Sequence, residues 1–477
     1  MSAVILRHSA VAAILCLVAF GFGCDPKVNN DDTSLEVTVR TSLSTASGQG
    51  NGDMIETDKP DISDDGRYLV FTSRASNLVS NDTNNQPDVF RRDNRTRTTV
   101  LVSINTGGTA SGNNSSGQPA ISGDGRYVVF SSKANDVAAG DTDLLVTPLQ
   151  DIFVRDMTTG ATTLVSRASG PAGVKATADC FAPQIAKTGR HVVFHTTSEN
   201  LDGVTAGGDD NDGAVFDVYR RDWLDPTNVF PTTLISVKSG FAPGTGNKGT
   251  GASSFASISS DGNLVAFESA AADLVSLTAD GAPDNNGSTD VFLRNVATNR
   301  TQLLSVRLST APSPDPGVDG PSSSPSFSAN GLYVVFRSLA GNLVAEDDGT
   351  ASDIFRRDLT NSLTQILSVH TSGSQAGNSC DFPNISNDGA IVTWQSSSSN
   401  LVNGDANASQ DCFVRNLTAQ TTGRVSVSTF GGELNALSAR PRISGDGRYV
   451  VFISQATNAA DDDSNGASDL FLRGPPF

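Results

Sequence analysis

Four acidic segments of the chain have a spacing that could hold a metal ion. Each places Asp, Asn and Asp at positions i, i+2 and i+6, and the four sets are Asp82, Asn84 and Asp88; Asp284, Asn286 and Asp290; Asp405, Asn407 and Asp411; and Asp463, Asn465 and Asp469. Oxygen ligands on alternate residues of a turning loop, closed by a carboxylate four residues on, are the donors that calcium favours. The spacing therefore predicts calcium sites.

Three further segments carry looser versions of this spacing. They are Asp347 with Asp353, Asn211 with Asp217, and Asp141 and Asp143 with Asp151. The pattern is similar to the calcium loops of integrin-type propellers and dockerins, but it lacks their further Asp or Asn at the fifth position. In the alternative interpretation, Asp and Asn cap turns and the last Asp of each set pairs with a neighbouring side chain.

An arginine follows the last Asp of each set by four residues, and it also occurs seven times. These residues are Arg92, Arg155, Arg221, Arg294, Arg357, Arg415 and Arg473. They could form a cationic ring around a ligand. The favoured interpretation is structural, because a position shared by every repeat serves the repeat; each arginine is then expected to pair with an Asp of its own or the next repeat.

The sequence contains little that indicates a catalytic motif. The four histidines are His8, His191, His195 and His370, and none has the spacing of a His-based metal site. No Gly-x-Ser-x-Gly elbow is present. His191 occupies the position that Tyr68 and Tyr127 hold in other repeats, which indicates a packed side chain. The sequence therefore predicts that the protein is not an enzyme.

These side chains are positioned by a repeated phrase. Ile121-Ser-Gly-Asp-Gly-Arg-Tyr-Val-Val-Phe130 returns unchanged at 443–452, and five looser copies begin at Ile62, Ile185, Ile258, Phe327 and Ile385. Ser-x-Asp-Gly is typical of a tight turn, and the β-branched and aromatic run after it is typical of a buried strand. The Asp-x-Phe-x-Arg phrase is a second strand, and a third apolar run follows most copies.

Four antiparallel strands repeated seven times predict an all-β fold, a seven-bladed β-propeller. Separate domains of about 60 residues would each have a marginal core. The last repeat stops after Arg473 without its fourth strand, whereas 35–42 resembles such a strand ahead of the first repeat. We therefore expect the N-terminal strand to complete the last blade within a propeller spanning 34–477 and so remove exposed sheet edges.

Residues 1–24 have the features of an export signal, with a basic start and a short apolar run. The ending Gly21-Phe-Gly-Cys24 resembles the cleavage site of bacterial lipoproteins, which implies lipidation of Cys24; ordinary secretion is the alternative. Residues 25–33 are polar and are expected to form a flexible tether. Cys380 and Cys412 share a predicted blade, where a disulfide and free thiols are both open, and Cys180 lies in another.

The formal net charge of −18 argues against nucleic-acid binding, which needs a basic surface. The connections between repeats are long and rich in Gly, Ser, Thr and Asn. In a four-stranded meander they emerge on one face together with the acidic loops. We expect an envelope protein or polymer ligand to bind on this face of a monomer.

The phrase Pro-x-Ile-Ser-x-Asp-Gly-Arg-Tyr-Val-Val-Phe, followed by Asp-Val-Phe-x-Arg-Asp, resembles the TolB-type (WD40-like) propeller repeat over about 35–473. The resemblance implies a non-catalytic binding module of the periplasm or cell surface, and the lipoprotein-like site at Cys24 implies attachment to a membrane through a lipid anchor only. Seven repeats, and no separate α/β domain, depart from TolB itself. The alternatives are a hydrolase or lyase with a central-channel site, and a calcium-stabilised structural protein of the surface.

Overall fold

The computed structural model describes residues 37–141, 148–170, 173–201, 215–225, 227, 229, 231–242, 247–275, 284, 286–307, 320–460 and 463–474. The predicted signal, the tether and Cys24 lie outside these residues, as do Asp143 and Asn211 of the looser acidic sets. Every regular element in the described part of the chain is a strand, and no helix of membrane-spanning length and apolarity occurs there.

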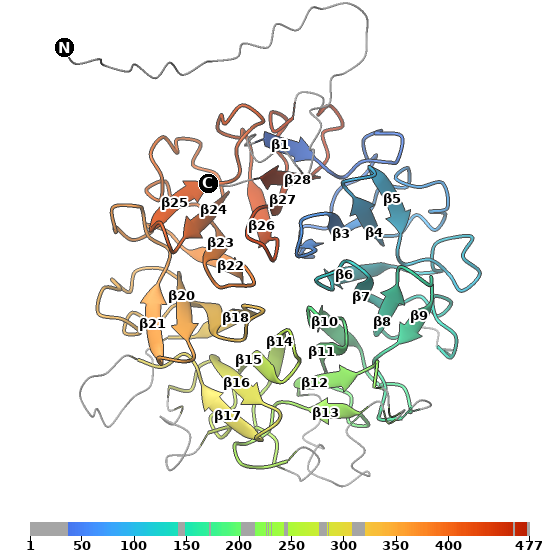
Figure 1. The fold of residues 1–477 in the computed structure, drawn as a ribbon, viewed down its shortest axis with the longest axis horizontal. Helices are drawn as coiled ribbons and strands as arrows, with labels where there is room; N and C mark the ends of the chain where they lie inside the picture. The colour runs from blue at the N-terminus through green and yellow to red at the C-terminus, as the bar shows by residue number, and fades with distance from the viewer. Residues whose placement is uncertain are drawn as a thin grey trace, which may run out of the picture.

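The described strands form seven four-stranded antiparallel sheets arranged as blades around a central axis (Figure 1). The predicted seven-bladed propeller is therefore confirmed. Blade 1 contains β2 (Asp61–Ile62), β3 (Tyr68–Ser73), β4 (Asp88–Asp93) and β5 (Thr98–Leu101). Blade 2 contains β6 (Ser116–Ile121), β7 (Tyr127–Ser132), β8 (Asp151–Asp156) and β9 (Thr162–Leu164). Blade 3 contains β10 (Cys180–Ile185), β11 (His191–Thr196), β12 (Asp217–Asp222) and β13 (Thr232–Leu234).

The remaining blades follow the same plan, with the first strand of each nearest the axis in Figure 1. Blade 4 contains β14 (Ser253–Ile258), β15 (Leu264–Ser269), β16 (Asp290–Asn295) and β17 (Arg300–Leu303). Blade 5 contains β18 (Ser322–Phe327), β19 (Tyr333–Ser338), β20 (Asp353–Asp358) and β21 (Leu363–Ile366). Blade 6 contains β22 (Cys380–Ile385), β23 (Ile391–Ser396), β24 (Asp411–Asn416) and β25 (Thr421–Arg424). Blade 7 combines β26 (Ser438–Ile443), β27 (Val450–Ser454) and β28 (Asp469–Gly474) with β1 (Val37–Arg40).

The two ends of the chain meet in blade 7, as the sequence predicted. Strand β1 pairs antiparallel with β28, with Val37 opposite Gly474 and Arg40 opposite Phe471. In Figure 1 the blue β1 therefore lies beside the dark red β28. The buried Thr38 hydroxyl donates a hydrogen bond of 2.6 Å to the carbonyl oxygen of Val427 in the preceding blade. Closure thus joins β1 to its own blade and to blade 6.

The repeated turn works through its serine and aspartate. In blade 2, the Ser122 hydroxyl donates to Asp124 at 2.6 Å and accepts the Tyr127 N–H at 2.9 Å. Gly125 takes a φ of 74°, and a Cβ added there would lie 2.1 Å from the Tyr68 ring of blade 1. The glycine is therefore required both by the turn and by the close approach of the neighbouring blade.

The hydrophobic core lies between consecutive blades rather than at one centre. Phenylalanine rings of the second and third strands stack within a blade, as Phe71 does on Phe90 with ring centroids 5.8 Å apart. One buried cluster combines β11 and β12 of blade 3 with blade 4 side chains, including Val193, Val218 and Phe267. The three described cysteines, Cys180, Cys380 and Cys412, are buried free thiols.

We predict that deleting 34–43 lowers the melting temperature by about 5 °C or more, because it removes β1 and its buried hydrogen bonds. Differential scanning calorimetry of the exported form measures this effect. Deletion of 25–33, the predicted tether, is the matched control and should leave the melt unchanged. Equal melting of both deletion variants would show that β1 contributes nothing to closure.

Candidate functional site

Each blade buries one carboxylate at the start of its third strand. In blade 1, Oδ1 of Asp88 accepts a hydrogen bond of 2.5 Å from the Ser103 hydroxyl just after β5, and Ser103 in turn accepts the Val89 N–H. The same pair recurs in every other blade as Asp151–Ser166, Asp217–Ser236, Asp290–Ser305, Asp353–Ser368, Asp411–Ser426 and Asp469–Ser42. The serine donates to Oδ1 of the aspartate only. The group that faces Oδ2 differs from blade to blade.

In blades 2 and 3 a lysine, half-buried in blade 2 and buried in blade 3, faces this second oxygen. Lys175 Nζ lies 2.6 Å from Oδ1 of Asp141 and 2.6 Å from Oδ2 of Asp151. Lys248 Nζ lies 3.2 Å from Oδ2 of Asp217. Each lysine comes from the connection that leads to the next blade, and each places one ammonium group at the start of the third strand.

In blades 6 and 7 an arginine at the end of the fourth strand takes the same place. Arg424 Nη1 lies 3.3 Å from Oδ1 of Asp405, 3.5 Å from Oδ2 of Asp411 and 2.7 Å from Glu433. Arg40 Nη1 lies 3.3 Å from Oδ1 of Asp463 and 3.6 Å from Oδ2 of Asp469. Asp405, Asp411 and Glu433 are close enough to one another to hold a metal. A guanidinium nitrogen already lies among them.

Blades 1 and 4 have the carboxylates without the cation. Oδ1 of Asp82, Oδ2 of Asp88 and both oxygens of Asp284 are buried and make no hydrogen bond to a described residue. Burial, reinforced by the Asp82 charge, raises the pKa of Asp88 to about 8. Burial and the Asp284 charge likewise raise the pKa of Asp290 to about 7.

The asparagine of each predicted calcium set stabilises the loop itself. Oδ1 of Asn84 accepts the Gln86 N–H at 2.7 Å, and its amide donates to the carbonyl oxygen of Gly112 at 2.8 Å. Asn286, Asn407 and Asn465 each accept the N–H two residues on in the same way. This is the turn-capping role that the alternative interpretation gave to Asn.

The recurring arginine of the third strand is structural, but its partners are not the expected aspartates. Each donates to a threonine hydroxyl of the fourth strand of its own blade, as Arg92 does to Thr99 at 3.1 Å. Arg92 also donates to the carbonyl oxygen of Leu43 in the preceding blade at 3.0 Å. The expectation of an Asp partner was wrong, because the threonine hydroxyl of the same blade and carbonyl groups of the preceding blade lie beside the guanidinium group.

The central channel differs from one blade to the next. A bulge in the first strand of blades 2 to 7 places one residue at a positive φ of 44° to 58°. In repeat order these residues are Gln118, Ala182, Phe255, Ser324, Phe382 and Arg440, and Lys59 has the matching position in blade 1. Several of the bulge N–H groups are bound by the preceding blade, as Oε1 of Gln118 accepts the Ala182 N–H at 2.9 Å. Seven equivalent blades therefore enclose a channel with unlike walls.

Basic side chains gather where blade 7 meets blade 1. The Arg440 guanidinium lies 3.6 Å from the Phe382 ring centroid, and Lys59 Nζ lies 5.6 Å from the same ring. Lys59 and Arg442 line a narrow cavity of about 40 Å³ together with residues of blades 3 to 6. Burial, followed by the charges of Arg442 and Arg440, lowers the pKa of Lys59 to about 7. Acidic groups oppose this effect: the charges of Glu268 and Asp61 favour the charged form of Lys59, and those of Asp381, Asp58 and Glu56 favour the charged form of Arg440.

The histidines of blade 3 are packed rather than reactive. A Cβ added to Gly262 would lie 2.1 Å from the His191 ring, so His191 takes the place of Tyr68 as predicted. His195 stacks against Phe181 and contacts Phe216 and Phe255. Burial lowers the pKa of His195 to about 4 and keeps its ring neutral.

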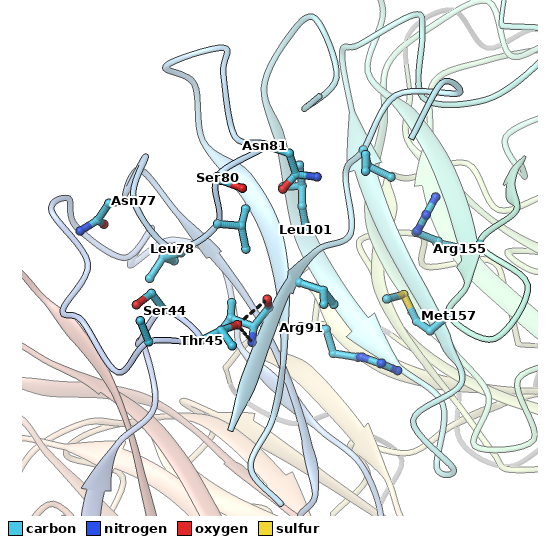
Figure 2. A pocket seen from close by; sticks show the side chains of 16 residues that line it. Ser44, Thr45, Asn77, Leu78, Ser80, Asn81, Arg91, Leu101, Arg155 and Met157 are labelled. Carbon is cyan, nitrogen blue, oxygen red and sulfur yellow. Dashed lines mark hydrogen bonds between the residues drawn. The ribbon is translucent and has the colours of Figure 1, made fainter. Parts of the chain in front are cut away.

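A second, larger hollow lies on the outside of blades 1 and 2. Figure 2 shows Thr45, Leu101, Arg91, Arg155 and Met157 around this groove of about 680 Å³. Its guanidinium groups are held by the blades, since Arg91 donates to the Gly125 carbonyl oxygen and Arg155 to Thr162. The groove therefore offers a mixed polar and apolar surface, whereas unlike charged and aromatic groups converge at the channel.

Comparisons with known proteins identify the fold. No protein-family model matches the sequence, and no curated protein matches it. Among solved structures, an oligogalacturonate lyase in complex with manganese matches with 12% identity and a TM-score of 0.50, covering 93% of this chain and 96% of the lyase. The oligogalacturonate lyase of Vibrio parahaemolyticus matches with 10% identity, the same coverage and a TM-score of 0.50. TolB from Acinetobacter baumannii matches with 13% identity over 70% of this chain and 58% of TolB, with a TM-score of 0.36.

These matches confirm the propeller fold, with TolB among the matched structures as the repeat predicted. They also correct the prediction that the protein is not an enzyme, because the two structures that match with a TM-score of 0.50 are lyases. That prediction relied on local motifs of other folds. In a propeller, groups from different blades meet at the channel, so a reactive set leaves no short motif in the sequence.

We predict that Lys175→Met lowers the free energy of unfolding by about 3 kcal/mol, because it leaves Asp141 and Asp151 buried without their shared cation. Guanidinium denaturation of the metal-free protein measures the change. Lys133→Met removes an exposed lysine of the same blade and should change stability by less than about 0.5 kcal/mol. Equal stability of the two variants would mean that the Lys175 ammonium group contributes nothing.

Proposed function

We propose that the protein is an exported propeller that binds a carboxylate-bearing polymer, such as an acidic polysaccharide, at the channel mouth formed by Lys59, Arg440 and Arg442. The observation that carries this proposal is the convergence of three basic side chains and the Phe382 ring at one place in a ring of seven similar blades. A feature shared by all blades serves the fold, whereas a feature confined to the junction of blades 7 and 1 is free to serve a ligand.

The chemistry of the channel mouth suits an acidic sugar. Carboxylates pair with guanidinium and ammonium groups, and the apolar face of a sugar ring packs on an aromatic ring. Phe255, on the blade 4 wall, is 48% exposed and adds a second aromatic surface. The matched lyases have oligogalacturonate in their names, an acidic polymer of this class.

The location of the site agrees with the expected binding face. The first strand of each blade begins at the connection from the preceding blade, so Lys59 and Arg440 lie toward the face that carries these long connections. The overall charge of −18 repels acidic polymers at long range, so attraction of such a ligand depends on the local basic cluster. Export and attachment through Cys24, as the N-terminal segment predicts, would place this face at the cell envelope.

We expect Lys59→Gln and Arg442→Gln each to weaken binding of polygalacturonate at least tenfold, because each removes a cation from the cluster. We expect a glutamine side chain to fit at the Lys59 position, because Gln118 occupies the matching position in blade 2. Isothermal titration calorimetry in a chelator buffer measures the affinity, with neutral dextran as the ligand control. Lys133→Gln should bind as the wild type does; equal losses in all three variants would exclude the channel as the site.

Binding should also depend on pH through Lys59. The pKa of this lysine is lowered to about 7, so its charge is largely present at pH 6 and largely lost at pH 8. If binding requires the charged form, affinity for polygalacturonate should fall about tenfold between these pH values in the wild type. Lys59→Gln should show no such fall, and an equally steep profile in this variant would assign the titration to another group.

A second candidate function, cleavage of the same class of polymer, is favoured by the position of Lys59 between two arginines. A neutral amine could remove the proton next to a carboxylate that Arg440 and Arg442 hold, after which the glycosidic oxygen leaves with a proton from water. The unsaturated product absorbs in the ultraviolet. Absorbance that grows with time in the wild type and not in Lys59→Gln would support cleavage; constant absorbance with tight binding would leave binding as the function.

We also propose a structural cation, with calcium as the expected ion, in the acidic loops on the long-connection face. This cation is separate from the channel and stabilises the ring. The matched manganese-bound lyase shows that a propeller of this fold can carry a metal, but it does not identify the ion or the ligands of this chain.

A further inference from the structure

We propose that calcium binds in two of the seven blades, between Asp82 and Asp88 of blade 1 and between Asp284 and Asp290 of blade 4, and that a lysine or arginine replaces it in blades 2, 3, 6 and 7. In blade 5, Oδ2 of Asp353 also makes no hydrogen bond to a described residue, but the loop carboxylate of Asp347 accepts the Gly349 N–H at 3.0 Å, so no site is assigned there. The inference rests on the proposed structural cation and assigns its number and location. It is independent of the channel and its ligand.

One oxygen of the loop aspartate and one of the strand aspartate face the same cation in several blades. Lys175 in blade 2, Arg424 in blade 6 and Arg40 in blade 7 each place one nitrogen close to Oδ1 of the loop aspartate and Oδ2 of the strand aspartate. In blade 1 the corresponding atoms are Oδ1 of Asp82 and Oδ2 of Asp88, and both are buried without a described hydrogen-bond donor. The oxygens that face a cation in the other blades therefore lack one among the described residues of blade 1. In blade 4 the Asn286 amide donates to Oδ2 of Asp290 at 2.8 Å, so the oxygens without a described donor are the two of Asp284.

Blades 1 and 4 have no lysine or arginine at the positions of Lys175 and Arg424. The connection that supplies Lys175 corresponds in blade 1 to 102–115, and neither this connection nor the acidic loop 75–88 contains a lysine or arginine. In blade 4 the acidic loop 270–289 contains none, and the connection 304–321 contains one, Arg307, which is exposed. At the end of the fourth strand, the place of Arg424, blades 1 and 4 have Leu101 and Leu303.

Burying these carboxylates without a positive charge beside them costs free energy. Asp88 is 0% exposed and Asp284 is 3% exposed, and an unpaired buried carboxylate is among the most expensive groups to bury. Two carboxylates facing one another require a charge of about +2 for neutrality. Their donors are oxygen atoms only, which favours calcium over zinc or copper.

A shared proton is the competing occupant, and it makes a different prediction. Protonation would satisfy one oxygen of each pair without any metal, and addition of calcium would then leave stability unchanged near neutral pH. A bound divalent ion instead gives stability that depends on ion concentration. The two occupants can therefore be separated by titrating the ion at constant pH.

The primary test uses the full-length exported protein after removal of metals with EGTA. We expect calorimetric titration with CaCl2 to count two ions per chain, and the melting temperature to rise by about 3 °C for each site at a hundredfold excess over its dissociation constant. MgCl2 should give a smaller shift, because magnesium keeps its own waters. An unchanged melt, or no measurable calcium binding, would overturn the inference.

Two substitutions test the location. The isolated bridge Ile104–Ser111 in blade 1 matches Arg167–Lys175 in blade 2, so Ser111→Lys places an ammonium group where Lys175 has one. This variant should bind one calcium instead of two and should melt higher than the wild type in EGTA. Ser80→Lys adds the same charge to an exposed position of the blade 1 loop and should still bind two. Two ions bound to Ser111→Lys would exclude the Asp82–Asp88 site.

The reverse substitution should create a site. Lys175→Met leaves Asp141 and Asp151 in the state proposed for blade 1, so this variant should bind a third calcium and recover part of its lost stability in CaCl2. If it binds only two ions, the lysine is not a substitute for the metal. Polygalacturonate affinity, measured in EGTA, should be the same for wild type, Ser111→Lys and Lys175→Met, so failure of the channel proposal and failure of the calcium proposal are distinct results.

Discussion

The buried aspartate at the start of the third strand is the constraint on which each blade depends. Its hydrogen bond to the serine after the fourth strand ties together the two outer strands in every blade, and in blade 7 the serine is Ser42, contributed by the N-terminal segment. The ring therefore closes through the same interaction that builds each blade. Because the carboxylate is buried, its second oxygen also needs a partner, and blades 2, 3, 6 and 7 supply a lysine or arginine for it.

A second set of interactions joins each blade to the next and is also repeated. The threonine beside each third-strand arginine donates to a carbonyl oxygen of the preceding blade in several blades, as Thr301 does to Val237 at 2.6 Å. On the opposite face, a tyrosine ring, His191 or an aliphatic side chain packs against the turn glycine of the following blade. These contacts keep neighbouring blades in register without requiring any particular side chain at the channel. The channel wall is thus the part of each repeat that is free to vary.

The number of blades, the closing strand and the packing of His191 could be predicted because they depend on local patterns that repeat. The Ser-x-Asp-Gly turn and the Asp-x-Phe-x-Arg strand each carry their own signal within ten residues. The channel cluster could not be predicted in this way, since Lys59 and Arg440 are 381 positions apart and become neighbours only when the ring closes. One signal was present: at the bulge position of the first strand, and at its match Lys59 in blade 1, only blades 1 and 7 have a basic residue. The partners of the third-strand arginines were missed because carbonyl groups have no sequence signature.

The contrast between blades also shows how a repeat protein can change its dependence on a ligand in small steps. A blade that needs a bound ion and a blade that has an internal lysine differ by a single side chain, as Ser111 and Lys175 do at matching positions. Arginine reaches the same carboxylates from the fourth strand in Arg424 and from β1 in Arg40, so two separate positions can supply the charge. Because the buried carboxylate itself is kept in all seven blades, what varies is the source of its counter-charge. An internal cation makes a blade independent of the surrounding ion concentration, whereas a blade without one ties its stability to that concentration.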